Sequence, residues 1–219
     1  MSQNKTNFAV PLAFVGMMFF AIGFALGINS FLIPVLKGAL SLPSGVAYLL
    51  LAATFVPFLI FGYPASATIA KIGYKRTMAL SFLIFAVAFI LFVLSAKLEN
   101  FILFLIASFV SGAANAYLQA SVNPYITILG PIESAAKRMS IMGICNKLAW
   151  PVAPLFFALV VADQTNVQTS DLYLPFYIII GVFLLLGIIS LMAPLPEVKA
   201  AGEDESDTAN CPYAANKTS

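Results

Sequence analysis

The sequence predicts an all-α membrane protein with six transmembrane helices, arranged as two groups of three. Hydrophobic residues make up 61% of the 219 residues and charged residues only 9%, whereas a soluble domain carries about 25% charged residues. The mean hydropathy is +0.98. Six apolar runs are also long enough to cross a bilayer, which takes about 20 helical residues.

The six runs are separated by short polar turns and form one predicted domain, residues 1–196, a transmembrane bundle. They cover residues 8–36, 45–69, 77–96, 101–127, 139–161 and 173–192. The intervening turns are KGALSLPS, AKIGYKR, AKLEN, GPIESAAKR and ADQTNVQTSD. No small-residue cleavage site followed by polar sequence comes after the first run, so we interpret it as a span. Residues 197–219 are polar and acidic, which predicts a flexible cytoplasmic loop or tail.

The basic residues predict that both termini are cytoplasmic. With the N-terminus inside, eight of the eleven basic residues fall on the cytoplasmic side and only Lys37 and Lys97 on the other. Cytoplasmic loops of membrane proteins carry this excess of Lys and Arg. The remaining basic residue, Lys147, lies within the fifth run. A lysine there costs about 2.5 to 3.5 kcal/mol on insertion, so we expect it to be functional.

The residue types present argue against several classes of function. The chain has no histidine, and its nine acidic residues all lie in the turns or the tail. We therefore expect no catalytic residue, no metal site and no cofactor, which makes a membrane enzyme the weakest hypothesis. Cys145 and Cys211 lack the spacing of metal ligands. A net charge of +2 without a basic run predicts no nucleic-acid binding.

Small and polar residues follow one side of three runs at helical spacing. They are Gly16, Gly23, Gly27, Ser30 and Pro34, with Asn29 beside them; Ser108, Gly112, Asn115, Gln119 and Asn123; and Ser140, Gly143, Lys147, Pro151 and Pro154. For the five glycines we favour close contacts between helices. For Asn115, Gln119, Asn146 and Lys147 we favour a water-filled cavity, with helix packing as the alternative.

Two further patterns involve the first, fourth and fifth runs. Asn29 and Gln119 each stand five residues before a proline, as a three-plus-three repeat would place them. Gln119 lies ten residues before Leu129, and Lys147 nine residues beyond Arg138. At about 1.5 Å per residue, both side chains are predicted near the middle of the membrane. We expect Asn123 and Pro124 to end or kink the fourth helix.

The combination of NPYITILGP, preceded by Gln119 and followed by ESAAKR and CNK, resembles the fucose permease family of the major facilitator superfamily, and within it the bacterial glucose/galactose transporters. GINSFLIPVLK resembles the family's first helix, and AKIGYKR resembles the superfamily's loop between helices two and three. The resemblance implies twelve helices in two halves, with a hexose bound between them. This chain is then half of a major-facilitator fold in a bacterial inner membrane, and its partner is the carboxy-terminal six-helix half.

Sugar hydroxyls need hydrogen-bond donors and acceptors, together with aromatic rings that cover the apolar side of the sugar. The predicted sugar-binding residues are Gln119, Asn146, Lys147, Asn115, Asn29, Ser30 and Trp150. Packing roles stay open for Asn115 and Trp150, and bonding to helix carbonyls or to an acidic residue of the other half stays open for Lys147. The residues expected to set topology or to latch conformations are Lys71, Gly73, Lys75, Arg76, Asn123 and Pro124.

The chain departs from the fucose permease at two carboxylates. Ser30 stands where that protein has an aspartate, and Gln119 where it has a glutamate. Lys147 is then the candidate for any proton coupling by this half, while H⁺, Na⁺ or neither remains open as the coupling ion. The leading hypothesis is secondary active transport, or symport, of a hexose by alternating access. The alternative is a non-transporting remnant or a helical partner subunit in the lipid bilayer.

Overall fold

The computed structural model describes residues 9–129, 132–161 and 167–192, nearly all of them helical. Among these residues, five helices are long and apolar enough to cross a membrane. They are α1 (Ala9–Ala39), α3 (Leu49–Leu98), α4 (Phe101–Ile128), α5 (Ala135–Val160) and α6 (Tyr173–Met192). A short helix, α2 (Ser44–Ala47), and two 3₁₀ turns, η1 (Ile132–Ser134) and η2 (Thr169–Leu172), connect them. The predicted all-α membrane fold is confirmed; the predicted tail, 197–219, lies outside the described residues.

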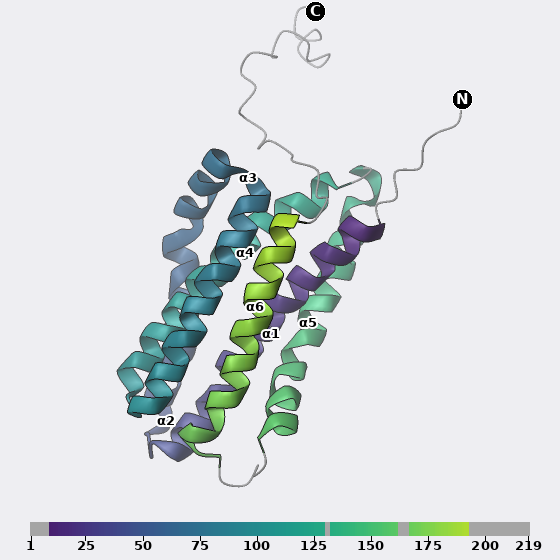
Figure 1. Ribbon diagram of the computed structural model, residues 1–219. Helices are drawn as coiled ribbons and strands as arrows, with labels where there is room; N and C mark the ends of the chain where they lie inside the picture. Colours follow the sequence, from purple (N-terminus) through teal and green to yellow (C-terminus); the bar gives the residue numbers. More distant parts are fainter. Residues whose placement is uncertain (1–8, 130–131, 162–166, 193–219) are drawn as a thin grey trace, which may run out of the picture.

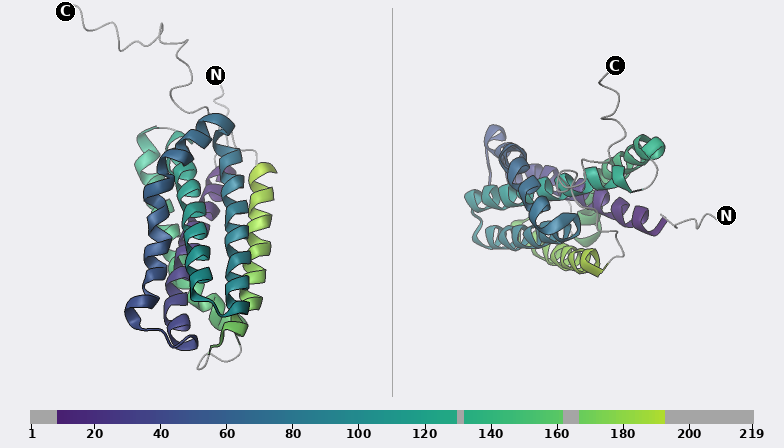
Figure 2. Two further views of the ribbon diagram at one scale, coloured as in Figure 1. Left: turned by 90° about the vertical axis from the view of Figure 1, so that its left-hand side faces the viewer. Right: turned by 90° about the horizontal axis from the view of Figure 1, so that it is seen from above.

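Helix α3 contains both the second and the third predicted span, which is why five long helices stand where six were predicted. Two helical arms, 49–72 and 74–98, meet at Gly73, whose φ of 83° and ψ of 168° are not helical. A side chain with a Cβ rarely adopts this conformation, so glycine is required here. The chain turns over at this point and runs back (Figures 1 and 2). AKIGYKR is therefore no loop, because one glycine is enough to reverse the chain.

Helix α4 continues through Pro124 to Ile128, so of the two expectations for Asn123 and Pro124, a helix end or a kink, the helix end is wrong. Two hydroxyls hydrogen-bond to backbone carbonyls on either side of the proline. Ser121 Oγ donates to the carbonyl of Tyr117 (2.9 Å), and Thr127 Oγ1 donates to that of Pro124 (2.6 Å). Neither bond reaches the carbonyl of Ala120, whose ladder partner is missing because Pro124 has no N–H, yet the helix continues, as transmembrane helices often do at proline.

Helices from one predicted group of three pack mainly against helices from the other group. Helix α1 packs mainly on α5, α4 packs on both arms of α3, and α6 packs on α3 (Figure 2). The α3–α6 contact is built from phenylalanines, such as Phe85 and Phe183, whose ring centroids are 4.8 Å apart. Neither group of three therefore forms a separate bundle.

Glycines allow the closest of these contacts, as predicted, at three of the five positions, namely Gly23, Gly27 and Gly112. A Cβ on Gly23 would collide with the carbonyl oxygen of Asn146, and one on Gly112 with that of Thr54. A Cβ on Gly27 would lie 2.9 Å from that of Ala153, and one on Gly16 would lie in ordinary contact with Met142. The prediction is wrong for Gly143, which is exposed: a Cβ there would meet no described atom within 4 Å.

Candidate functional site

Helix α5 is the most open of the long helices and carries a polar stripe on its open side. In its most apolar window only 17% of the residues are buried, against 33% to 61% in the other four helices. The stripe consists of Ser140, Gly143, Lys147, Pro151 and Pro154, and all five residues are exposed. The predicted stripe therefore faces away from the bundle rather than into it.

Lys147 lies in the middle of this stripe. Its Nζ is 5.1 Å from the centroid of the half-buried Trp150 ring, one turn further along α5. This is a cation–π distance, at which the ring face attracts the ammonium group. Within the described residues no carboxylate pairs with Lys147. Among these residues, only the aromatic face meets its charge, and none accepts a hydrogen bond from its three N–H donors.

Asn146, the neighbour of Lys147, turns toward α1 instead. Its Nδ2 donates a hydrogen bond of 3.0 Å to the carbonyl oxygen of Phe19, and the side chain is only partly buried. The donor of this amide thus helps to hold α5 on α1. Asn146 combines a packing role with the partial exposure that a ligand contact needs.

Asn29 and Asn115 are fully buried between α1 and α4. Asn29 Nδ2 donates to the carbonyl of Ala25 (3.0 Å) and to Ser111 Oγ (3.3 Å). Asn115 Nδ2 lies 3.5 Å from the carbonyl of Ile22. Both Oδ1 atoms lack a partner within the described part of the chain. These geometries match the packing alternative more closely than an open cavity; Ser111, which takes part, was missed by the sequence analysis.

Gln119 and Ser30 are half-buried. The hydroxyl of Ser30 donates to the carbonyl of Leu26 within its own helix, at 3.1 Å. Gln119 makes no side-chain hydrogen bond to any described residue, so its amide is free to bind a ligand. Counted along their helices at about 1.5 Å per residue, Gln119 and Lys147 lie roughly 14 and 18 Å from the same end of the bundle.

The residues predicted to act as topology and latch residues gather at that end. Lys71, Lys75 and Arg76 flank Gly73, where α3 turns, and Lys71 and Arg76 are exposed. Asn123 and Pro124 lie in the last turns of α4, half-buried and exposed respectively.

Arg138, also at this end, was counted in the sequence only as one of the eight basic residues on the cytoplasmic side, yet it is only 8% exposed. Its Nε donates to the carbonyl of Ile126 (3.2 Å) and its Nη2 to that of Thr127 (3.1 Å), while Nη1 bonds to Ser134 Oγ. The last carbonyls of a helix lack partners within it and carry negative partial charge. A basic residue shortly after a helix end is the signal that could have indicated this clasp.

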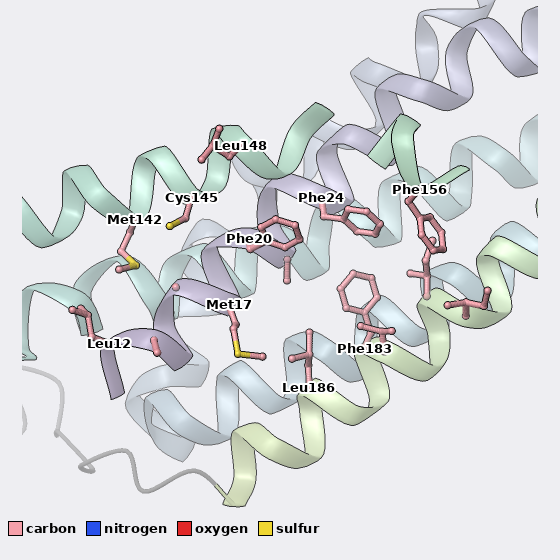
Figure 3. A pocket seen from close by; sticks show the side chains of 16 residues that line it. Leu12, Met17, Phe20, Phe24, Met142, Cys145, Leu148, Phe156, Phe183 and Leu186 are labelled. Carbon is pink, nitrogen blue, oxygen red and sulfur yellow. The ribbon is translucent and has the colours of Figure 1, made fainter. Parts of the chain in front are cut away.

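A groove of about 850 Å³ lies elsewhere, between α1, α5 and α6 (Figure 3). Its walls are apolar side chains, including Met17, Phe20 and Leu186. Such a lining offers no set of donors and acceptors to orient a sugar. The groove therefore lies apart from the polar candidates on α4 and on the open face of α5.

Comparison with known proteins agrees with this architecture. The sequence model described as the Major Facilitator Superfamily matches residues 14–216. A glucose/galactose transporter of Brucella abortus biovar 1 (strain 9-941) is 31% identical over 209 residues, which are 93% of this chain and 50% of that protein. An L-fucose-proton symporter of Escherichia coli (strain K12) is 23% identical over 233 residues, covering 97% of this chain and 53% of the symporter.

A solved structure shows the same fold. The crystal structure of the transporter FucP in the outward conformation superposes with a TM-score of 0.74 at 23% identity, over 87% of this chain and 51% of that one. The chain thus spans about half the length of the curated relatives and of the solved structure that it matches.

Proposed function

Because this chain belongs to the major facilitator superfamily, we propose that it is the amino-terminal half of a hexose transporter that works by alternating access. The relatives named above are transporters of glucose and galactose or of fucose. Glucose or galactose is the proposed substrate, since the more similar of the two relatives carries these sugars in its name. The proposed location is a bacterial inner membrane, with both termini in the cytoplasm.

The observation that carries this proposal is the open polar stripe on α5. A lysine facing lipid at this depth would be costly, so intramembrane lysines normally face a bundle interior or a water-filled cavity. The described residues leave the stripe uncovered. A second six-helix half, packed against this side, would turn the stripe into one wall of a polar cavity near the midplane, where transporters of this kind bind substrate.

We assign the sugar contacts from the groups that remain available. Gln119 offers both a donor and an acceptor, Lys147 offers donors, and Trp150 offers an aromatic face. Asn146 and Ser30 can contribute from their partly exposed positions. Asn29 and Asn115 lie behind these sugar contacts. There they hold α1 against α4, so that the two helices move together. Any proton coupling through this half would use Lys147, and a sodium ion is the other coupling ion considered.

The test is uptake into vesicles. The chain is produced alone, and also together with six further spans, provided either by the DNA that follows the Ser219 codon or by a neighbouring gene. We expect no uptake of labelled glucose or galactose by the chain alone and saturable uptake by the pair. Saturable uptake by the chain alone would contradict the half-transporter assignment. Correct insertion of both halves without any uptake would favour a non-transporting partner subunit.

A further inference from the structure

The apolar groove between α1, α5 and α6 has no part in the proposed sugar pathway. Figure 3 shows Met17 and Phe20 of α1, Cys145 of α5, and Phe183 and Leu186 of α6 around it, and Leu148 of α5 also lines it. On α5, Cys145 lies two residues from Lys147, which is about 200° around a helix with 3.6 residues per turn. The groove and the Lys147 stripe therefore occupy opposite sides of α5.

The length of the groove matches one leaflet of a bilayer. Its lining on α1 runs from Leu12 to Phe24, about 18 Å at 1.5 Å per residue. Half of a typical hydrocarbon core measures about 15 Å. The α1 lining begins three residues after the start of that helix, whereas the α5 lining runs from Met142 to Phe156, deeper along its helix. The upper end of the groove therefore lies toward the end of the bundle at which α1 and α5 begin (Figure 1).

Among the residues that the structure describes, that end of the bundle is basic. The described side chains there include five basic residues, namely Lys71, Lys75, Arg76, Lys137 and Arg138, against the single acidic residue Glu133. At the other end, Lys37 and Lys97 are balanced by Glu99 and Asp171. Basic residues next to the membrane attract anionic lipid headgroups.

Lys137 is the basic residue that lies on the same face of α5 as residues that line the groove. It is exposed and precedes Ile141, Cys145 and Leu148 at intervals of four, four and three residues, so all four lie on one face of α5. Cys145 and Leu148 line the groove. A headgroup beside Lys137 would thus stand directly above the groove, with its acyl chain pointing into it.

Other occupants fit less well. The sequence that follows Met192 reads APLPEVKAA and then GEDESDTAN, which is too charged as a whole for an apolar lining. A sugar would lose its hydrogen bonds to water there without replacing them. An acyl chain loses nothing, because its surroundings are apolar both in the bilayer and in the groove.

We propose that this groove is a binding site for an anionic phospholipid, with an acyl chain between α1, α5 and α6 and the headgroup phosphate at Lys137. The site is distinct from the sugar pathway and belongs to the leaflet at the basic end of the bundle.

Native mass spectrometry of the full 219-residue chain tests this, after equilibration with phosphatidylglycerol or with phosphatidylcholine of the same acyl chains. Ala13→Phe fills the groove from an exposed position on its lining, and Lys137→Gln removes the headgroup contact. The matched controls are Ile90→Phe, at an exposed apolar position on α3 outside the groove, and Lys71→Gln, an exposed lysine at the same end. Thermal melting checks that each variant is folded.

We expect the wild-type chain to retain phosphatidylglycerol in preference to phosphatidylcholine. Lys137→Gln should weaken retention of phosphatidylglycerol about fivefold, Ala13→Phe should remove retention of both lipids, and the two controls should change neither. Equal retention of the two lipids, or unchanged retention by Ala13→Phe, would overturn the proposal. So would efficient Cys145–Cys145 cross-linking in a Cys211→Ser background, because it would show that a second copy covers the groove.

Discussion

The guanidinium of Arg138, near the start of α5, donates a 3.2 Å hydrogen bond from Nε to the carbonyl oxygen of Ile126 near the end of α4. A second bond, from Nη2 to the next carbonyl along, makes the contact bidentate. The side chain is buried, so water replaces neither bond. Arg138 therefore ties the two helices that carry Gln119 and Lys147 to each other at one end.

Replacing Arg138 should destabilise this junction. Hydrogen bonds to charged groups contribute about 1.5 to 3 kcal/mol each, so Arg138→Ala should lower the free energy of unfolding by roughly 2 kcal/mol or more. Arg138→Lys should recover part of the loss, since a lysine keeps the charge but not the forked geometry. Thermal melting in detergent measures both. Lys71→Ala, an exposed basic residue at the same end, is the control, and equal effects of Arg138→Ala and Lys71→Ala would refute the clasp.

Gly23 should not tolerate even one methyl group. A Cβ there would overlap the carbonyl oxygen of Asn146, so Gly23→Ala must push α1 away from α5. We expect a loss of about 1 to 3 kcal/mol, as for other overpacked sites. Gly62→Ala on α3 has open space around it and should be neutral or slightly stabilising. Melting temperatures of the two variants compare them directly, and a neutral Gly23→Ala would show that the helices separate without cost.

The Asn29–Ser111 bond should contribute a modest coupling energy. Hydrogen bonds between membrane helices average about 0.6 kcal/mol in double-mutant cycles. The cycle of Asn29→Ala, Ser111→Ala and the double variant should give a coupling of this size, because the 3.3 Å bond joins two buried side chains. Additive single effects would mean that the two groups act independently.

Gln119 and Lys147 carry the sugar-binding assignment. In the complete transporter, Gln119→Ala and Lys147→Ala should each lower uptake by about tenfold or more while membrane insertion stays normal, since each removes hydrogen bonds to the ligand. Ile144→Ala, an exposed apolar position one turn before Leu148, is the control on α5. Normal uptake by both variants would refute the assignment of these two residues to sugar binding.

Lys147→Arg separates charge from proton exchange, because arginine stays protonated throughout the working pH range. If Lys147 only donates hydrogen bonds, the variant should keep substantial uptake with an unchanged pH profile. If it carries a proton, the variant should bind sugar but lose pH-driven accumulation. Uptake measured with and without a pH gradient distinguishes the two roles.

The membrane spans could be predicted because the hydrophobic signal of each extends over about 20 residues or more. Structural features that depend on a single residue could not be predicted in this way. The charges of AKIGYKR suggested a loop, but α3 stays helical on both sides of a single glycine with positive φ. Pro124 suggested a helix end or a kink, but α4 continues through it to Ile128. Periodicity placed Lys147 correctly on a stripe with Ser140 and Gly143.

Periodicity alone does not say whether a stripe faces a neighbouring helix or an open side. Asn115 and Lys147 were treated alike, although the first is fully buried against α1 and the second is exposed. That difference depends on which helices become neighbours. The pairing of α1 with α5, rather than with the next helix in sequence, is set by the close approach at Gly23 and Gly27.

This pairing has a consequence for biosynthesis. The amide of Asn146 and the carbonyl of Phe19 that it contacts are 127 residues apart in the chain. At roughly 5 to 20 residues per second, the ribosome needs on the order of 10 s between them. During that interval the glycine face of α1 has entered the membrane without its final neighbour. Lipid, or a membrane chaperone, must cover that face until the fifth span emerges.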